Sequence, residues 1–178
     1  MTDDIQFFVK GEPKGQPRPR AFARRVGDKF IARVYDAGTA EGWKSQIAIA
    51  AKPFLPESPI LGAVGITITF NMPRPMSHYR TGKNEGQLKP DAPWFCTGKP
   101  DFDNLVKAVL DALTTLGMWM DDKQVVIAHV TKYYALRGQE GADIEIFRLE
   151  GKTSLKQPPF LETHADKYDA ARERFLPA

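Results

Sequence analysis

Three aspartates in the middle of the chain have the residue type and spacing of a metal site. Asp101 and Asp103 follow Pro100, which favours an extended approach to them, and Asp122 comes 19 residues after Asp103. In an extended segment residues two apart point the same way, so the first two carboxylates should meet while Phe102 points into the core. A divalent cation relieves the repulsion between close carboxylates. The spacing therefore predicts an Mg²⁺ site, which Asp122 completes.

Lys107 is the expected electrostatic partner of this site. It lies four residues after Asp103, so its ammonium shares a face with the carboxylates if a helix begins there. A lysine beside a bound metal can neutralise charge that builds on a phosphodiester during hydrolysis. Structural alternatives remain open from the residues alone. Asp103 would then cap the helix, Asp101 and the Asp121–Asp122 pair would be turn residues, and Lys107 would form a surface ion pair.

The distribution of basic residues points to a polyanionic partner. The chain has 25 Lys and Arg against 22 Asp and Glu, a net charge of +3, but residues 10–33 alone hold eight cations and two acids, a local charge of +6. The stretch 72–98 adds cations interleaved with aromatic residues, which suits phosphates and bases. A solvated basic loop is the alternative. The residues expected to contact DNA phosphates are Lys14, Arg18, Arg20, Arg24, Arg25, Arg74, Arg80 and Lys83.

Hydrophobic periodicity predicts an α+β fold. Alternating apolar residues indicate strands over 5–10, 60–71, 124–134 and 142–149, and helical spacing indicates one helix from Thr39 to the prolines at 53 and 56 and another over 104–116. The basic stretch between Arg18 and Arg33 should be a loop or an irregular hairpin. This order predicts a mixed β-sheet of about four strands with helices packed mainly on one face, and a site where the second helix begins.

Length and composition favour one domain, over residues 1–150, with a C-terminal extension over 151–178 that holds a possible short helix at 164–175. The single cysteine, Cys96, excludes an internal disulfide and every multi-cysteine zinc site. The acidic residues of the first four positions are unlike the basic start of a signal peptide, and no apolar run approaches the roughly 20 residues of a membrane span. We therefore expect a cytoplasmic protein with no membrane partner.

The run Lys-Pro-Asp-Phe-Asp-Asn-Leu at 99–105, followed by Lys107, Asp121-Asp122 and Gln-Val-Val at 124–126, resembles the RusA-like family of Holliday junction resolvases. The resemblance implies an Mg²⁺-dependent endodeoxyribonuclease that cuts four-way DNA junctions as a homodimer in recombination and repair, often encoded in prophages. It also implies catalytic carboxylates at Asp101, Asp103 and Asp122 and an essential lysine at Lys107. The long stretch 72–98 and the extension 151–178 depart from the family pattern.

Two symmetric cuts in a four-way junction require two active sites, which a two-fold dimer supplies economically. Three alternatives to a junction resolvase remain open. The first is a nuclease for other branched DNA, the second is a non-catalytic nucleic-acid-binding protein whose acids are structural, and the third is a small phosphohydrolase that acts on nucleotides.

Overall fold

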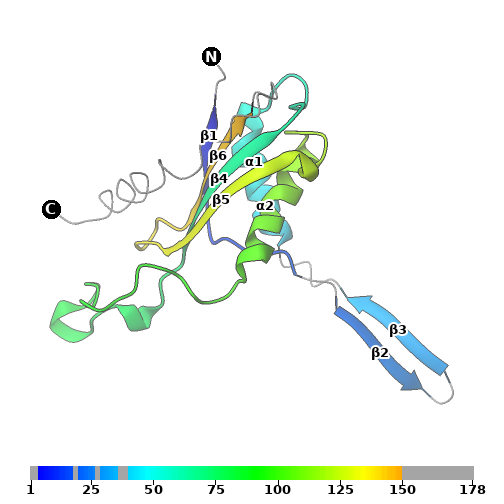
Figure 1. The fold of residues 1–178 in the computed structure, drawn as a ribbon. Coiled ribbons are helices and arrows are strands. Elements are labelled where there is room, and N and C mark those ends of the chain that lie inside the picture. The colour runs from blue at the N-terminus through cyan, green and yellow to red at the C-terminus, as the bar shows by residue number, and fades with distance from the viewer. Residues whose placement is uncertain (1–3, 18–19, 27–28, 36–39, 150–178) are drawn as a thin grey trace.

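The computed structural model describes residues 4–17, 20–26, 29–35 and 40–149. Four strands form one open mixed sheet with the order β1–β6–β4–β5 (Figure 1). β6 lies antiparallel to both β1 and β4, whereas β4 and β5 are parallel. The strands are β1 (Ile5–Lys10), β4 (Val64–Met72), β5 (Val125–Tyr134) and β6 (Gly141–Arg148). The predicted α+β class and four-stranded mixed sheet are confirmed.

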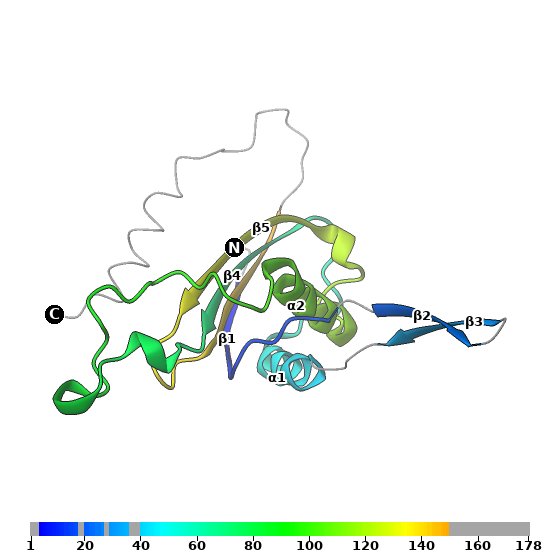
Figure 2. The same ribbon diagram turned by 90° about the horizontal axis from the view of Figure 1, so that it is seen from below.

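Two helices, α1 (Glu41–Ala51) and α2 (Phe102–Leu116), cover the same face of this sheet (Figure 2). α2 lies in the crossover that a parallel pair of strands requires between β4 and β5. Its residues Leu105, Val109 and Leu113 recur every four positions and are fully buried, as are Ile66 and Ile68 of β4. The sheet and the two helices therefore share one hydrophobic core. No described helix is long and apolar enough to cross a membrane.

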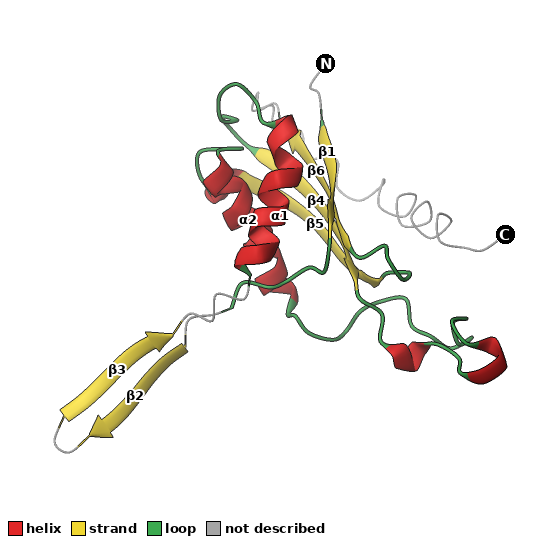
Figure 3. Ribbon diagram, turned by 180° about the vertical axis from the view of Figure 1, so that it is seen from behind, coloured by secondary structure: helices red, strands yellow, loops and turns green. Residues whose placement is uncertain are grey.

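The basic stretch forms a regular antiparallel hairpin, β2 (Arg20–Val26) and β3 (Lys29–Tyr35), rather than an irregular one. The two strands pair without a break from Arg20 opposite Tyr35 to Val26 opposite Lys29. This hairpin is a separate two-stranded sheet, and it extends away from the body formed by the main sheet and the helices (Figure 3). Such a ribbon is narrow enough to enter a DNA groove.

The predicted element boundaries shift at several places. α2 begins at Phe102, two residues before the predicted start, and β4 begins at Val64 instead of position 60. α1 ends at Ala51 and continues as one 3₁₀ turn, η1 (Lys52–Phe54), where Pro53 cannot donate a helical hydrogen bond. Thr39, the expected cap of α1, and the predicted C-terminal helix at 164–175 lie outside the described residues.

The long stretch between β4 and α2 contains two 3₁₀ turns, η2 (Met76–His78) and η3 (Gly82–Asn84), and is anchored by Arg74. The Arg74 side chain donates to the carbonyl oxygens of Pro93 (Nη1, 2.8 Å), Tyr134 (Nη2, 3.1 Å) and Ala135 (Nε, 3.3 Å). Its guanidinium also lies over the Trp94 ring, 5.7 Å from the centroid, and over the Tyr134 ring, at 5.3 Å. These contacts hold both ends of the stretch against the end of β5.

Candidate active site

The start of α2 presents the first two predicted acids. Asp101 is the N-cap residue, with φ −65° and ψ 145°, and its carbonyl oxygen accepts a hydrogen bond from the Leu105 amide at 3.1 Å. Within the described chain, the Asp101 side chain accepts no capping hydrogen bond from the N–H groups of α2. Asp103 lies in the first turn, and both aspartates are exposed. The Asp101 carboxylate is therefore not used to cap the helix, and the helix dipole favours negative charge at this position.

The prediction that Phe102 points into the core is wrong. Phe102 is the first residue of α2 and is 50% exposed. The expected position of Phe102 depends on an extended segment from Asp101 to Asp103, in which alternate side chains face opposite ways. Because the helix already begins at Phe102, that alternation does not apply, and the ring lies at the surface beside the two acids.

A segment near the N-terminus packs across the start of α2. The Gln16 amide donates to the Asn104 carbonyl oxygen at 2.8 Å. A Cβ atom on Gly15 would lie 3.0 Å from the Cβ atoms of both Asn104 and Pro100, so this close approach favours glycine. The same segment carries Lys14, which forms an ion pair of 2.6 Å with Glu12. The basic N-terminal region therefore begins directly beside the two acids.

Lys107 pairs along the helix with Asp111. The distance from its Nζ to Asp111 Oδ1 is 3.3 Å, and the Lys107 side chain is 60% exposed. Asp111 Oδ2 also lies 3.9 Å from the Nζ of Lys44 on α1. An exposed pair of this kind contributes little to stability and is easily exchanged for another anion, so Lys107 can turn toward a phosphate at modest cost.

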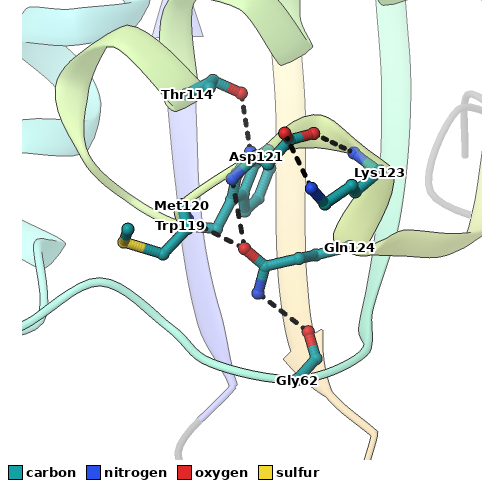
Figure 4. Close-up of polar contacts among 7 residues, drawn as sticks. All are labelled: Gly62, Thr114, Trp119, Met120, Asp121, Lys123 and Gln124. Atoms are coloured by element: carbon teal, nitrogen blue, oxygen red, sulfur yellow. Dashed lines mark hydrogen bonds and ion pairs between the residues drawn. The ribbon is translucent and has the colours of Figure 1, made fainter.

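The third predicted acid lies beyond the other end of α2, in the turn η4 (Asp122–Gln124). Asp121 caps this turn: its Oδ1 accepts from the Lys123 amide at 3.0 Å, and its own amide donates to Gln124 Oε1 at 3.1 Å (Figure 4). Hydrogen bonds from the backbone and side chain of Lys123 lower the pKa of the Asp121 carboxyl. The neighbouring Asp122 is exposed. The structure thus gives Asp121 a local structural role in this turn, whereas Asp122 is exposed at the surface.

Gln124 belongs to the sequence run that carries the family resemblance, and the structure gives its side chain a role that the resemblance does not imply. Its Oε1 accepts from the amides of Met120 and Asp121, and its Nε2 donates to the carbonyl oxygens of Ile60 and Gly62, each at 2.9 Å. This side chain ties the turn that carries Asp122 to the start of the β4 region. The spacing Asp-x-x-Gln from 121 to 124 is that of a capping box, which is the local signal that predicts this role.

A single chain does not bring the three predicted acids together. α2 has 15 residues, so its ends are separated by about 22 Å at 1.5 Å per residue. Asp101 precedes the helix and Asp122 follows its end at Leu116 by six residues. Among the described residues, no group of three or more His, Cys, Asp or Glu side chains lies close enough to hold a metal ion. The predicted metal site of Asp101, Asp103 and Asp122 stays a prediction.

The residues predicted to contact DNA have different environments. Arg74, predicted to contact DNA, is 8% exposed and donates to three carbonyl oxygens, so its guanidinium is occupied within the protein. Burial lowers the pKa of its guanidinium, yet an arginine stays protonated at physiological pH. Arg80 is half-buried and Lys83 is exposed on η3. Three of the others, Arg20, Arg24 and Arg25, lie on β2, and Arg18 lies outside the described residues.

Comparison with known proteins gives a family. The sequence model of the family described as Endodeoxyribonuclease RusA matches residues 10–146. YqaN, an uncharacterized protein of Bacillus subtilis, is 37% identical over 138 residues, which cover 75% of this chain and 89% of that protein. The crossover junction endodeoxyribonucleases RusA of Escherichia coli K12 and of enterobacteria phage 82 are each 53% identical over 38 residues, 21% of this chain and 32% of theirs. The chain therefore belongs to the RusA family of endodeoxyribonucleases.

Proposed function

We propose that the chain is an Mg²⁺-dependent endodeoxyribonuclease that resolves four-way DNA junctions as a homodimer, in DNA recombination and repair. The observation that carries this proposal is the exposed pair Asp101 and Asp103 at the start of α2, where the Asp101 carboxylate does not cap the helix. Family membership supplies the class of reaction. Carboxylate oxygens are the ligands that Mg²⁺ prefers, and one or two of them with water and phosphate oxygens commonly suffice. The residues present therefore fit this ion.

In this proposal Asp101 and Asp103 hold the cation, and the third carboxylate is Asp122 of the partner subunit. When bound there by Asp101 and Asp103, Mg²⁺ would supply Lewis-acid chemistry for phosphodiester hydrolysis. Lys107 leaves its ion pair with Asp111 and contacts the phosphodiester, where it stabilises the negative charge that develops on the phosphate. The ion pair with Asp111 keeps the lysine extended on the exposed face of α2 before DNA binds.

The distance along α2 is the argument for a dimer. If two α2 helices lie antiparallel across a two-fold axis, the start of each lies beside the end of the other, and the contacts are reciprocal. Asp101 and Asp103 of one subunit then approach the partner subunit's Asp122. Two exposed apolar residues support this arrangement, because Phe102 (50% exposed) and Met120 (66% exposed) flank the acids at opposite ends of α2 and would cover each other.

A groove of about 440 Å³ beside the end of α2 is suited to receive the partner. Asp111, Met120, Asp121 and Asp122 are among its lining residues. Asp101 and Asp103 of the partner subunit would face Asp122 in this groove, and a divalent cation relieves the repulsion between such close carboxylates. This arrangement produces two equivalent sites related by the symmetry axis, as two symmetric cuts in a four-way junction require.

The hairpin β2–β3 is the proposed DNA grip. It carries Arg20, Arg24 and Arg25 on one strand and extends from the side of the molecule where α2 begins (Figure 3). Contacts of arginine with backbone phosphates bring affinity and orientation without sequence preference. Selection of branched DNA then depends on the spacing of the two sites and the two arms in the dimer.

The direct test is cleavage of synthetic four-way, flap and linear DNA with Mg²⁺ and with EDTA. We expect paired symmetric cuts in the four-way junction with Mg²⁺ and none with EDTA. Asp101→Asn should abolish cleavage and keep junction binding, whereas Asp91→Asn, a change of an exposed loop acid, should leave cleavage intact. Junction binding without cleavage in any divalent ion would instead identify a non-catalytic DNA-binding protein. Faster cutting of flaps would identify another branched substrate, and activity on nucleotides alone would identify a phosphohydrolase.

A further inference from the structure

The segment that leads into Asp101 lies along the outer edge of β5. The Tyr134 amide donates to the Trp94 carbonyl oxygen at 2.8 Å, and the Cys96 amide donates to the Lys132 carbonyl oxygen at 3.0 Å. Phe95 pairs with Tyr133 as an antiparallel bridge between these two bonds. Backbone hydrogen bonds thus fix this segment to the sheet as far as Cys96.

Beyond Cys96 the Lys132 side chain continues the attachment. Its Nζ donates to the carbonyl oxygen of Gly98 at 2.6 Å and to that of Pro100 at 2.9 Å. Lys132 lies opposite Phe70 of β4 in the parallel register, and Phe70 is fully buried. Side chains that pair across neighbouring strands share a face, so Lys132 lies on the helix-covered face of the sheet. There its ammonium reaches the peptide group immediately before Asp101.

These two bonds are of the strong, charge-assisted kind. A lysine ammonium has three donors and no acceptor, and a hydrogen bond from a charged donor is about twice as strong as a neutral one. Two of the donors are spent on carbonyl oxygens that flank Lys99. Pro100, which carries the second of these carbonyl oxygens, is bonded directly to Asp101, the N-cap residue of α2. The position of the Asp101 backbone therefore depends on a side chain from β5.

We infer that Lys132 is a positioning residue of the metal site: it fixes the approach to α2 so that Asp101 is held ready for the cation. This inference rests on the proposed function, because it assigns Lys132 a purpose toward the same cation. Lys132 contacts neither substrate nor metal in this account, and it acts only through Gly98 and Pro100. Residues that orient metal ligands typically change metal affinity about 10- to 100-fold when they are replaced.

The test compares Lys132→Met, Lys132→Arg and Lys52→Met, the last being a control at an exposed lysine in η1. Mn²⁺ binding is measured by electron paramagnetic resonance, and backbone order is measured by hydrogen exchange in a peptide over 96–104. We expect Lys132→Met to raise the Mn²⁺ dissociation constant about 10-fold and to speed exchange in that peptide. Its affinity for junction DNA should change less than twofold. Lys132→Arg, which keeps two charged donors, should restore most of the Mn²⁺ affinity.

A purely structural role would lower the folded fraction without changing the Mn²⁺ affinity of the folded protein. Unchanged Mn²⁺ affinity and exchange in folded Lys132→Met would therefore overturn the inference while the proposed function stands. If Lys132→Met does not fold, Lys132→Gln replaces it with the same expected direction and the same refuting result. A wild-type protein that neither binds Mn²⁺ nor cuts junctions would overturn the proposed function itself.

Discussion

Two inactive variants, Asp101→Asn and Asp122→Asn, should restore cleavage when their chains are combined in one dimer. Oxygen ligands lie about 2.1 Å from Mg²⁺, so two of its ligand atoms are at most about 4 Å apart. Asp122 lines a groove with Asp111 and Thr114, which are 10 and 13 residues further along the chain than Asp101, so about 15 to 20 Å separates Asp101 from Asp122 within one chain. Each site must then take Asp122 from the partner subunit. A mixed dimer has one site with both substitutions and one site with neither.

The expected magnitude follows from this geometry. Random exchange of equal amounts puts about half of the dimers in the mixed form, so about one quarter of all sites keep every ligand, and selection of the mixed dimer through both tags raises this share to about one half. Because only one site of a mixed dimer is intact, the product should be a nick rather than paired cuts. The assay uses a supercoiled plasmid that extrudes a cruciform and measures the nicked and linear forms after the two variants are coexpressed with different tags and purified together.

A mixture of Asp101→Asn with Asp103→Asn is the matched control. Both substitutions lie at the same end of α2, so every site of that mixed dimer carries one of them and no cleavage should return. The reasoning is refuted if the purified Asp101→Asn and Asp122→Asn dimer stays inactive although the wild-type protein cuts. It is also refuted if the control mixture recovers equally well, since recovery would then not depend on which end of α2 is changed.

Three further outcomes are expected. Arg74→Met leaves the carbonyl oxygens of three residues without their charged donor, so the free energy of unfolding in urea should fall by about 3 kcal/mol, and a loss below about 1 kcal/mol would argue against its anchoring role. Replacing Arg20 and Arg24 with alanine should reduce the slope of log affinity against log salt by about 2 in filter-binding titrations; an equal slope would mean that the hairpin does not contact phosphate. Gly117 has φ +86° at the end of α2, so Gly117→Ala should lower the unfolding free energy by about 1 kcal/mol in thermal denaturation, and an equal or higher stability would contradict the strain argument.

The sequence predicted most of the fold because its signals are local. The strands β1, β4 and β6 alternate buried apolar residues with others, whereas the edge strand β5 has no fully buried residue, and α2 repeats its buried leucines and valine every four positions. The start of α2 was harder to predict, since Pro100 and Asp101 fit both an extended segment and a helix N-terminus. That two-residue difference is what moved Phe102 from the expected core to the surface.

The sequence identified the acids of the candidate site but not their separation. The predicted helix over 104–116 already lies between Asp103 and Asp122, but the sequence does not reveal whether the loop after that helix returns to the helix start. The same limit explains why Arg74 was expected to contact DNA although it is buried. A cation in a basic, aromatic stretch fits DNA binding as well as burial. Its carbonyl acceptors lie 19, 60 and 61 residues away, so only the tertiary structure assigns its donors. Lys132 is hidden for the same reason, because its acceptors precede it by 32 and 34 residues.

The most direct measurement of the central claim is anomalous diffraction from crystals of the protein grown with Mn²⁺. The account predicts an anomalous peak at the start of α2, bound by Asp101 and Asp103 of one subunit and by Asp122 of the partner subunit, and a second peak related by the two-fold axis. A dimer that binds Mn²⁺ elsewhere, or that leaves Asp122 of both subunits far from Asp101 and Asp103, would contradict it.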